Sequence, residues 1–260
     1  MARQTDNGVP GGVIVVQRVV SILESFSDES PELGIADLAR STGLSASTVH
    51  RLVSSLELHG ILDHGQIRGK YRLGLRLFQF GELAISKVSY VDRAADVLAE
   101  LTQTTGETAH MGVLRNGLAL YVAKVEGWRS LRLPSQVGKT VSPHCCAMGK
   151  CLLAYLDDVA AKRIIDGLDF VRHTDRTLTD AEQLHQELLD VREAGYAYDR
   201  GELELELACV SAPIFDYTGG IVAAVSVSGP EQRVLGDSEL EYRDAVVRSA
   251  REISRRLGAR

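Results

Sequence analysis

The sequence has 260 residues, of which 45% are apolar and 25% charged, a composition typical of a folded globular protein and not of a disordered chain. This length is close to the upper limit of a single hydrophobic core, so it favours two domains. Apolar runs stay short of the ~18 residues of a membrane helix, the N-terminus lacks a secretion signal, and four cysteines form no disulfide pattern, so a cytoplasmic protein is expected.

The net charge of −6 is unevenly distributed along the chain. Residues 1–39 carry two basic and six acidic side chains, whereas residues 40–76 carry six basic and two acidic ones. The charges of these two stretches cancel, so residues 77–260 carry the net charge of −6. A short basic stretch in an otherwise acidic chain indicates a small surface that binds nucleic acid.

The N-terminal segment of residues 1–12 contains three glycines and a proline without any apolar period, which predicts a disordered tail. Apolar residues then recur at helical spacing and predict the inward face of a helix over 13–26: Val16, Val19, Val20 and Leu23. The polar segment 27–34 contains Pro31 and is expected to end this helix.

Residues 35–60 show the pattern of a helix-turn-helix. Ile35 and Leu38 mark a short helix, Gly43 is placed to end it, and Ser45 is a suitable N-cap for a second helix. The second helix has an apolar face formed by Val49, Leu52, Val53 and Leu56. Its opposite face is polar and is expected to read DNA.

Two short strands, 61–64 and 70–73, flank a turn with a glycine at each end and predict a basic hairpin, or wing. Together, the second helix and the wing supply the predicted DNA-binding residues: Ser45, Ser47, Thr48, His50, Arg51, Ser54, Arg68, Lys70 and Arg72. Each hydroxyl alone fits a solvated helix equally well, because base and phosphate contacts cannot be distinguished from sequence.

A helix over 76–87 follows, and a second one over 91–104 ends at Gly106. The first has more apolar side chains than a connector needs: Leu77, Phe78, Leu83 and Ala84. Such a stripe predicts a contact between two copies of the chain. Helix-turn-helix proteins bind two-fold symmetric DNA sites, which also requires two copies of the chain to pair.

The C-terminal part alternates strands and helices and predicts an α+β domain. Strands over 111–114 and 118–125 flank an Asn-Gly turn, and helices are expected over 146–156, 159–165 and 180–194, the last with Thr179 and Glu182 as a capping box. Strands 196–199, 205–215 and 221–228 and a helix over 238–257 complete the expected elements.

Two neighbouring strands of this domain carry candidate ligand-binding side chains. Ser226 and Ser228 share one strand face, and Leu205, Leu207 and Cys209 share a face of the adjacent strand. The segment from Ser142 leads into a helix start, where amides attract anions such as a carboxylate. These groups predict a pocket for a small acid, although each is also explained as an ordinary strand or core residue.

Two other chemistries remain open in the same domain. Glu202, Glu204 and Glu206 alternate with leucines, which favours a solvated strand face over a calcium site. The cluster His144, Cys145, Cys146 and Cys151 leaves a metal or redox sensor possible, but no C-x-x-C pair is present. A nucleophilic Cys209 would need a base, for which only His144 qualifies, so no catalytic residue, cofactor or metal is expected.

Five segments, in chain order, resemble the IclR family of transcription regulators: LARSTGLSASTVHRLVSSLELHG, KYRLG, VGKTVSPHCCAMGKCLLAYL, GYAYDRGELELELACVSAPIFD and VAAVSVSGP. The resemblance implies a winged helix-turn-helix, a linker helix and a GAF-like effector-binding domain. The expected division is a disordered tail over 1–12, the DNA-binding domain over 13–74, the linker over 75–89 and the effector domain over 90–260.

The resemblance also implies a regulator, expected to be a repressor, whose binding to double-stranded operator DNA is controlled by a small organic acid. It implies dimers and often tetramers. By position, the effector contacts would be Ala147, Met148, Asp199, Leu207, Cys209, Ser226 and Ser228. The alternative is a cysteine-based redox or metal sensor, or a cysteine-based enzyme, in the C-terminal domain.

The chain departs from the family pattern at two places. Cys145 and Cys146 follow His144 where the family usually has alanine and then threonine or serine, and Glu206 stands where it usually has glycine. Larger side chains there alter the size or polarity of a pocket, so the ligand of another member cannot be transferred.

Overall fold

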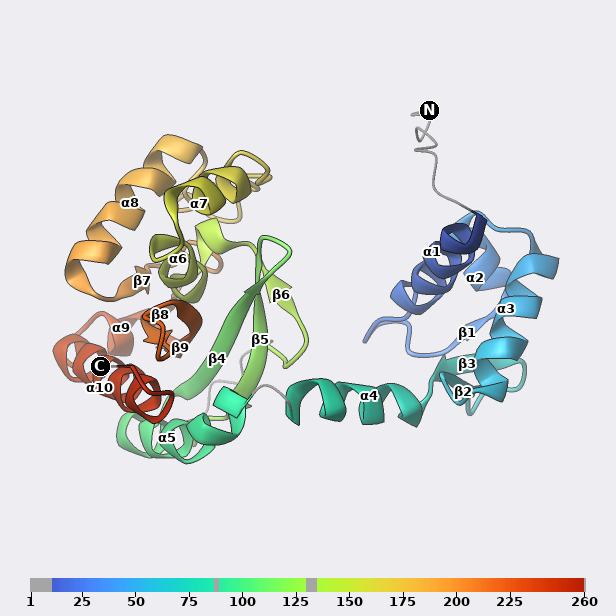
Figure 1. Cartoon of the computed structure of the whole chain (residues 1–260), viewed down its shortest axis with the longest axis horizontal. Coiled ribbons are helices and arrows are strands. Elements are labelled where there is room, and N and C mark those ends of the chain that lie inside the picture. The colour runs from blue at the N-terminus through green and yellow to red at the C-terminus, as the bar shows by residue number, and fades with distance from the viewer. Residues whose placement is uncertain (1–10, 87–88, 130–134, 260) are drawn as a thin grey trace. The chain divides into compact units, whose positions relative to one another are not determined.

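The computed structural model describes residues 11–86, 89–129 and 135–259 (Figure 1). The chain forms two compact units, Met1–Lys87 and Val88–Arg260, each described here by itself. The finer expected division, with a linker over 75–89, stays a prediction. Most of the expected tail lies outside the described residues, but Gly11 and Gly12 already belong to the first helix.

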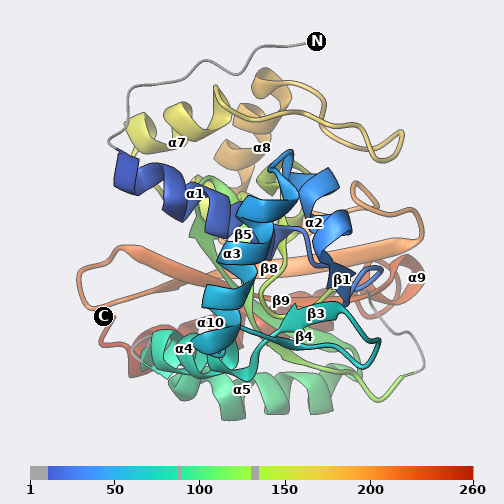
Figure 2. The ribbon, with the colours of Figure 1, turned by 90° about the vertical axis from the view of Figure 1, so that its right-hand side faces the viewer.

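The first unit contains helices around a small antiparallel sheet. Its elements are α1 (Gly11–Glu24), β1 (Leu33–Gly34), α2 (Ile35–Thr42), α3 (Ala46–Leu58), β2 (Leu62–His64), β3 (Lys70–Leu73) and α4 (Leu75–Ser86). Figure 2 faces this unit and shows α3 between α1 and α2. The fully buried side chains of its core are Ile22, Leu38, Val49, Val53 and Leu62.

The predicted helix-turn-helix is confirmed in its details. Gly43 ends α2 with φ of +68°, a left-handed conformation that glycine adopts without steric cost. Ser45 caps α3, because its hydroxyl accepts a 3.3 Å hydrogen bond from the Thr48 amide. The short helix, turn and second helix therefore follow directly from these local residues.

The inward face predicted for α1 is half wrong, since Val19 and Leu23 are partly buried but Val16 and Val20 are not, and one strand was missed. On α1, Val16 is 60% exposed and Val20 44% exposed, whereas Ile22 is fully buried. Apolar residues cover well over half of the helix circumference, so periodicity could not identify which stripe packs inward. The strand β1 was missed because two residues show no alternation, and its pairing of Leu33 with Tyr71 depends on a distant part of the chain.

The second unit is built on a six-stranded antiparallel sheet of order β6-β5-β4-β9-β8-β7. The strands are β4 (Thr108–Arg115), β5 (Leu118–Val125), β6 (Thr140–Val141), β7 (Ala197–Asp199), β8 (Leu207–Phe215) and β9 (Ile221–Pro230). The helices are α5 (Ser89–Thr105), η1 (Pro143–Cys145), α6 (Ala147–Ala154), α7 (Asp158–Ile165), α8 (Ala181–Ala194), α9 (Glu231–Val234) and α10 (Glu239–Arg256).

The sheet separates two hydrophobic cores. Figure 1 shows α6, α7 and α8 on one side of it and α5 and α10 on the other. Side chains at alternate positions of β8, such as Ala208 and Val210, pack into the core with α5 and α10. The positions between them, such as Cys209, face the core that contains α6 and α8. No described helix combines the length and apolar character needed to span a bilayer.

The acidic-leucine segment is not a strand, contrary to expectation. Strand β8 begins at Leu207, and Glu206 just before it has φ of +64°. Residues 201–206 form bends and a turn instead, so their side chains do not alternate. As a result, Glu202 is buried, whereas Glu204 is exposed.

Smaller differences concern helix ends and faces. The N-cap of α8 is Asp180, whose carboxylate accepts a 2.9 Å hydrogen bond from the Gln183 amide, so the expected Thr179–Glu182 capping box is one residue out of register. On α5, Ala95 is exposed although its spacing suggested the core, and Val97 takes the buried position.

Candidate functional site

The polar face of α3 is fully accessible in the first unit. Ser47, His50, Arg51 and Ser54 are all exposed, whereas Val49 and Val53 on the opposite face are buried. At the helix start, the Ser45 hydroxyl lies 3.1 Å from that of Ser47 and 2.9 Å from that of Thr48. The predicted contacts of this helix therefore form one surface, with hydroxyls at its N-terminus and an arginine one turn further on.

The wing is a regular hairpin in which His64 pairs with Tyr71 and Asp63 with Arg72. Arg68 and Arg72 are exposed, and Lys70 is half-buried. The structure thus places the predicted basic side chains along the turn and the returning strand.

Sequence reasoning missed the residue that holds the wing turn. The Glu32 carboxylate accepts hydrogen bonds of 2.7 Å from the Gln66 amide and 3.1 Å from the Ile67 amide. These two bonds lower the pKa of Glu32, and Arg72 adds to the effect. A Cβ atom on Gly65 would lie 2.6 Å from the same carboxylate, so a larger residue there would displace the Glu32 side chain.

Large apolar side chains are exposed on two helices of the first unit. They are Ile14, Val15, Val16 and Val20 on α1, and Leu75, Phe78, Phe80 and Leu83 on α4. Among the expected stripe residues of α4, Leu77 is half-buried and the Ala84 side chain lies outside the described part. A surface of this kind is typical of a protein–protein contact.

In the second unit, strand register brings the predicted ligand-binding residues together. Asp199 on β7 pairs with Cys209 on β8, which pairs with Ser228 on β9. Ser226 on β9 pairs with His110 on β4. We call this surface the inner face: Asp199, Cys209, Ser226, Ser228, His110 and Tyr121.

Helix α6 and the preceding turn η1 cover the inner face. Ala147 and Met148 are buried at the start of α6, in the same core as Cys209 and Tyr121. The Met148 sulfur packs so closely on Gly112 that a Cβ there would lie 2.3 Å away. Leu207 is half-buried two residues before Cys209. The proposed effector contacts therefore come from four elements around one sheet face.

Asp199 is a buried acid on this face, with 1% of its surface exposed. Its carboxylate accepts a 2.8 Å hydrogen bond from the Glu202 amide. Burial, and then the neighbouring Glu202 carboxylate, raise the pKa of Asp199 to about 7.

Beside it lies a buried ion pair that sequence reasoning missed. Lys150 on α6 is fully buried, and its ammonium donates to Glu202 at 2.7 Å and to Glu187 at 3.0 Å. The third donor hydrogen reaches the Tyr198 carbonyl oxygen at 2.9 Å. A lysine within the apolar run of α6 was the signal available for it.

The far end of the inner face is also polar. The imidazole Nε2 of His110 lies 2.7 Å from the Ser135 hydroxyl, and its Nδ1 lies 3.5 Å from the Ser228 hydroxyl. Lys124 donates to the Ser135 carbonyl oxygen at 2.8 Å. Burial lowers the pKa of His110 to about 3, so the imidazole is neutral. Sequence reasoning missed this group too.

The cysteines are in surroundings that oppose thiolate chemistry. Burial raises the pKa of Cys145 and of Cys151 to about 12, and it also raises the pKa of Cys146 and Cys209. Among the described residues, no three His, Cys, Asp or Glu side chains are placed to hold a metal ion.

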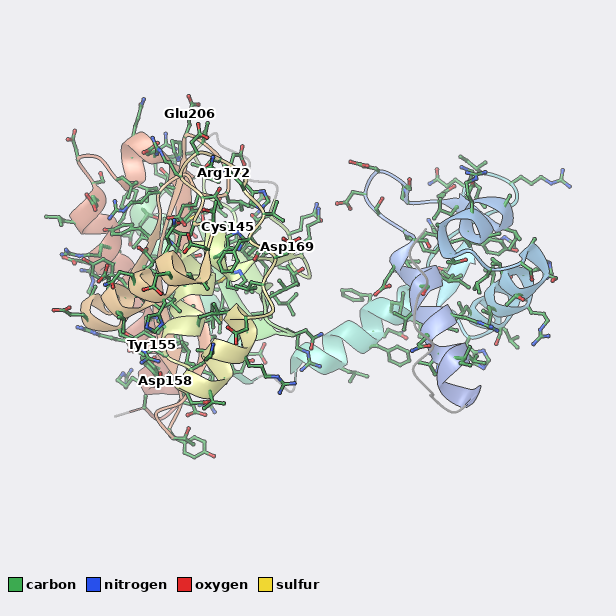
Figure 3. The ribbon with its side chains drawn as sticks, turned by 90° about the horizontal axis from the view of Figure 1, so that it is seen from above. Cys145, Tyr155, Asp158, Asp169, Arg172 and Glu206 are labelled. Carbon is green, nitrogen blue, oxygen red and sulfur yellow. The ribbon has the colours of Figure 1, made fainter. Side chains whose placement is uncertain are left out.

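His144 is engaged and does not contact Cys209 through either ring nitrogen. Its Nδ1 lies 2.7 Å from the Ser142 hydroxyl, and its Nε2 lies 3.1 Å from the Val171 carbonyl oxygen. Figure 3 shows Cys145 next to the segment that carries Asp169 and Arg172. The hydrogen-bond contact between His144 and the Val171 carbonyl oxygen joins this segment to the η1 turn.

Nearly the whole chain matches known proteins. The model of the IclR helix-turn-helix domain matches residues 15–64, and that of the bacterial transcriptional regulator IclR C-terminal domain matches residues 82–255. The Escherichia coli regulator XynR is 34% identical over 94% of this chain and 96% of its own. The E. coli regulator KdgR is 35% identical over 96% of this chain and 94% of its own.

Solved structures show the same similarity. An IclR homologue from Microbacterium hydrocarbonoxydans, crystallised in complex with 4-hydroxybenzoate, is 26% identical with a TM-score of 0.83. The match covers 94% of this chain and 98% of that one.

Proposed function

This chain belongs to the IclR family of bacterial DNA-binding transcription regulators, and we propose that it is a repressor that leaves double-stranded operator DNA when a small organic acid binds. The observation that carries the proposal is the exposed polar face of α3 behind the left-handed turn at Gly43. A recognition helix requires such an accessible polar face opposite a buried apolar one.

The proposed DNA contacts divide between base edges and phosphates. His50, Arg51 and Ser54 lie on the part of α3 that would enter the major groove, where an arginine can bind a guanine edge. Ser45, Ser47 and Thr48 at the helix start are suited to phosphates. The wing residues Arg68, Lys70 and Arg72 are suited to phosphates or to the minor groove.

The regulator is proposed to act as a dimer in the cytoplasm, where its DNA is found. The exposed apolar side chains of α1 and α4 supply a surface for pairing two copies. A two-fold protein binds an inverted repeat with half-sites about one helical turn, or a multiple of it, apart. Two such dimers would form the tetramer expected from the resemblance.

The effector is proposed to bind on the inner face, below the start of α6. Its contacts would be Ala147, Met148, Asp199, Leu207, Cys209, Ser226 and Ser228. The carboxylic acid bound by the M. hydrocarbonoxydans homologue supports this class of ligand. The buried thiols, with their raised pKa values, argue against the cysteine-based alternative, both as a sensor and as an enzyme.

The effector half of the proposal is tested by a thermal-shift screen of the full chain against small carboxylic acids, since a ligand of the folded state raises its unfolding midpoint. We expect a hit that is weakened in Ser226→Ala and unchanged in Ser249→Ala, a serine on α10. A shift with an oxidant or zinc, and with no acid, would contradict the proposal.

A further inference from the structure

Asp199 presents an electrostatic conflict for a site that binds an organic acid. The residue is 1% exposed and pairs across the strands with Cys209, which in turn pairs with Ser228. An ionised aspartate at this position would repel the carboxylate of an effector held by the neighbouring serine.

Lys150 does not remove this conflict. An ammonium group has three donor hydrogens. Here they are directed to Glu202, to Glu187 and to the Tyr198 carbonyl oxygen. The charge of Lys150 lowers the pKa of Asp199 less than burial and Glu202 raise it, and none of the three hydrogen bonds goes to Asp199.

Glu202 adds a second buried negative charge. One of its carboxylate oxygens bonds Lys150, and the other, Oε2, is buried with no hydrogen-bond partner among the described residues. Asp199, Glu202 and the partly exposed Glu187 are thus three acids around the single base Lys150, and the first two lie in a water-poor region. Such a cluster is most stable when one of the acids holds a proton.

The other ionisable groups that face Asp199 cannot supply a positive charge. They are the thiols of Cys145, Cys146 and Cys209, from the η1 turn, the start of α6 and β8, and the phenol of Tyr121 on β5. Burial raises the pKa of each one, and the charge of Asp199 raises it further, so all four are neutral at physiological pH.

Resting on the proposed function, we propose that the effector carboxylate binds against the protonated carboxyl group of Asp199, so that binding takes up a proton whenever Asp199 is ionised in the free protein. The proton comes from solvent and stays on Asp199, whose O–H donates to the effector carboxylate. No other bond forms or breaks. Hydrogen bonds of this charged kind are short and are about twice as strong as those between neutral groups.

This arrangement makes Asp199 a determinant of ligand class. It favours a carboxylate over the corresponding amide, because an amide oxygen accepts a weaker hydrogen bond from the same acid. It also predicts that the affinity for a carboxylate decreases as the pH rises. Asp199 has its own pKa of about 7, so carboxylate affinity should be constant in acid and fall about tenfold per pH unit well above that value.

The protonation is measured directly by following the side-chain carboxyl carbon of Asp199 by NMR in the full chain labelled at aspartate. The signal is assigned by its loss in Asp199→Asn. We expect a midpoint near pH 7 in the free protein, and a higher one in the presence of 4-hydroxybenzoate, pyruvate or acetate. A midpoint below about pH 5, or one that none of these three acids raises, would overturn the proposal.

The coupling is measured by calorimetric titration of the same three acids in buffers of different ionisation enthalpy, which counts the protons taken up. Asp199→Asn keeps a donor in place of the protonated acid, so it should bind the acids without proton uptake and without pH dependence. Asp175→Asn alters an exposed aspartate and should behave as the unaltered protein.

The two possible failures are distinguishable in this experiment. Acid binding that is unchanged between about pH 6 and pH 8 overturns the proton coupling and leaves the proposed effector class standing. If none of the acids binds at either pH, the proposed effector class fails, and the coupling fails with it.

Discussion

The ammonium of Lys150 lies 2.7 Å from the Glu202 carboxylate in the interior of the second unit, and their side chains are 0% and 8% exposed. Lys150 comes from α6, whereas Glu202 belongs to the bend that follows β7. The same lysine also bonds Tyr198 on β7 and Glu187 on α8. One side chain thus joins the helix above the inner face to the segment that carries Asp199.

Breaking this pair should destabilise the second unit strongly. Lys150→Met leaves the Glu202 carboxylate buried without a cation, for which we expect a loss of about 3–5 kcal/mol in the free energy of unfolding by urea. The double variant with Glu202→Gln should recover part of that loss. Lys162→Met, which alters an exposed ion pair, should change the free energy by less than about 1 kcal/mol. Equal losses for Lys150→Met and Lys162→Met would contradict the interpretation.

The wing depends on Glu32 for its shape. Glu32→Ala removes the acceptor of the Gln66 and Ile67 amides, so the wing turn should lose its fixed position. We expect DNA affinity, measured by fluorescence anisotropy, to fall several-fold, with little change in the unfolding midpoint. Glu29→Ala serves as the control, since that side chain is exposed. An unaltered affinity in Glu32→Ala would remove the wing from the DNA-binding surface.

Pairing of two copies should depend on the apolar surface of α4. Phe78 is 66% exposed, and Phe78→Asp places a charge in the proposed interface. We expect the molar mass measured by light scattering to fall to that of a smaller assembly at the same concentration. Val159→Asp, on an 80% exposed side chain of α7, should leave the mass unchanged. A mass that is insensitive to Phe78→Asp would exclude α4 from the interface.

The four thiols should be inert in the folded protein. Their burial and raised pKa values keep the thiolate fraction very low at neutral pH. We therefore expect modification by iodoacetamide to be at least about tenfold slower in the native protein than in urea. A single cysteine that reacts at the unfolded rate would revive the redox alternative.

The parts of the fold that sequence predicted well are those with local causes. Gly43 needs only its own backbone freedom, and Ser45 needs only the Thr48 amide three residues away. The Asn116–Gly117 turn likewise joins β4 and β5 as expected, with positive φ at both residues. These features are readable because each is determined within a few residues.

The parts that were missed depend on distant partners. The alternation of leucine and glutamate over 203–207 resembles a strand. In the structure the chain bends at 201–204, where Glu202 is buried against Lys150, 52 positions away. His110 meets Ser228 only after β4 and β9 pair, and it meets Ser135 through the segment between β5 and β6. Of the inner face, strand periodicity predicted the two serines and Cys209, whereas Asp199 came only from the family resemblance.

The central claim, that the face of α3 reads DNA for a two-fold regulator, is tested most directly by selecting bound sites from random DNA with the full chain and with Arg51→Ala. The account predicts that the unaltered protein enriches an inverted repeat and that Arg51→Ala loses the preference at one position of each half-site while unfolding at the same temperature. Enrichment of no sequence, or of an identical one by both proteins, would contradict it.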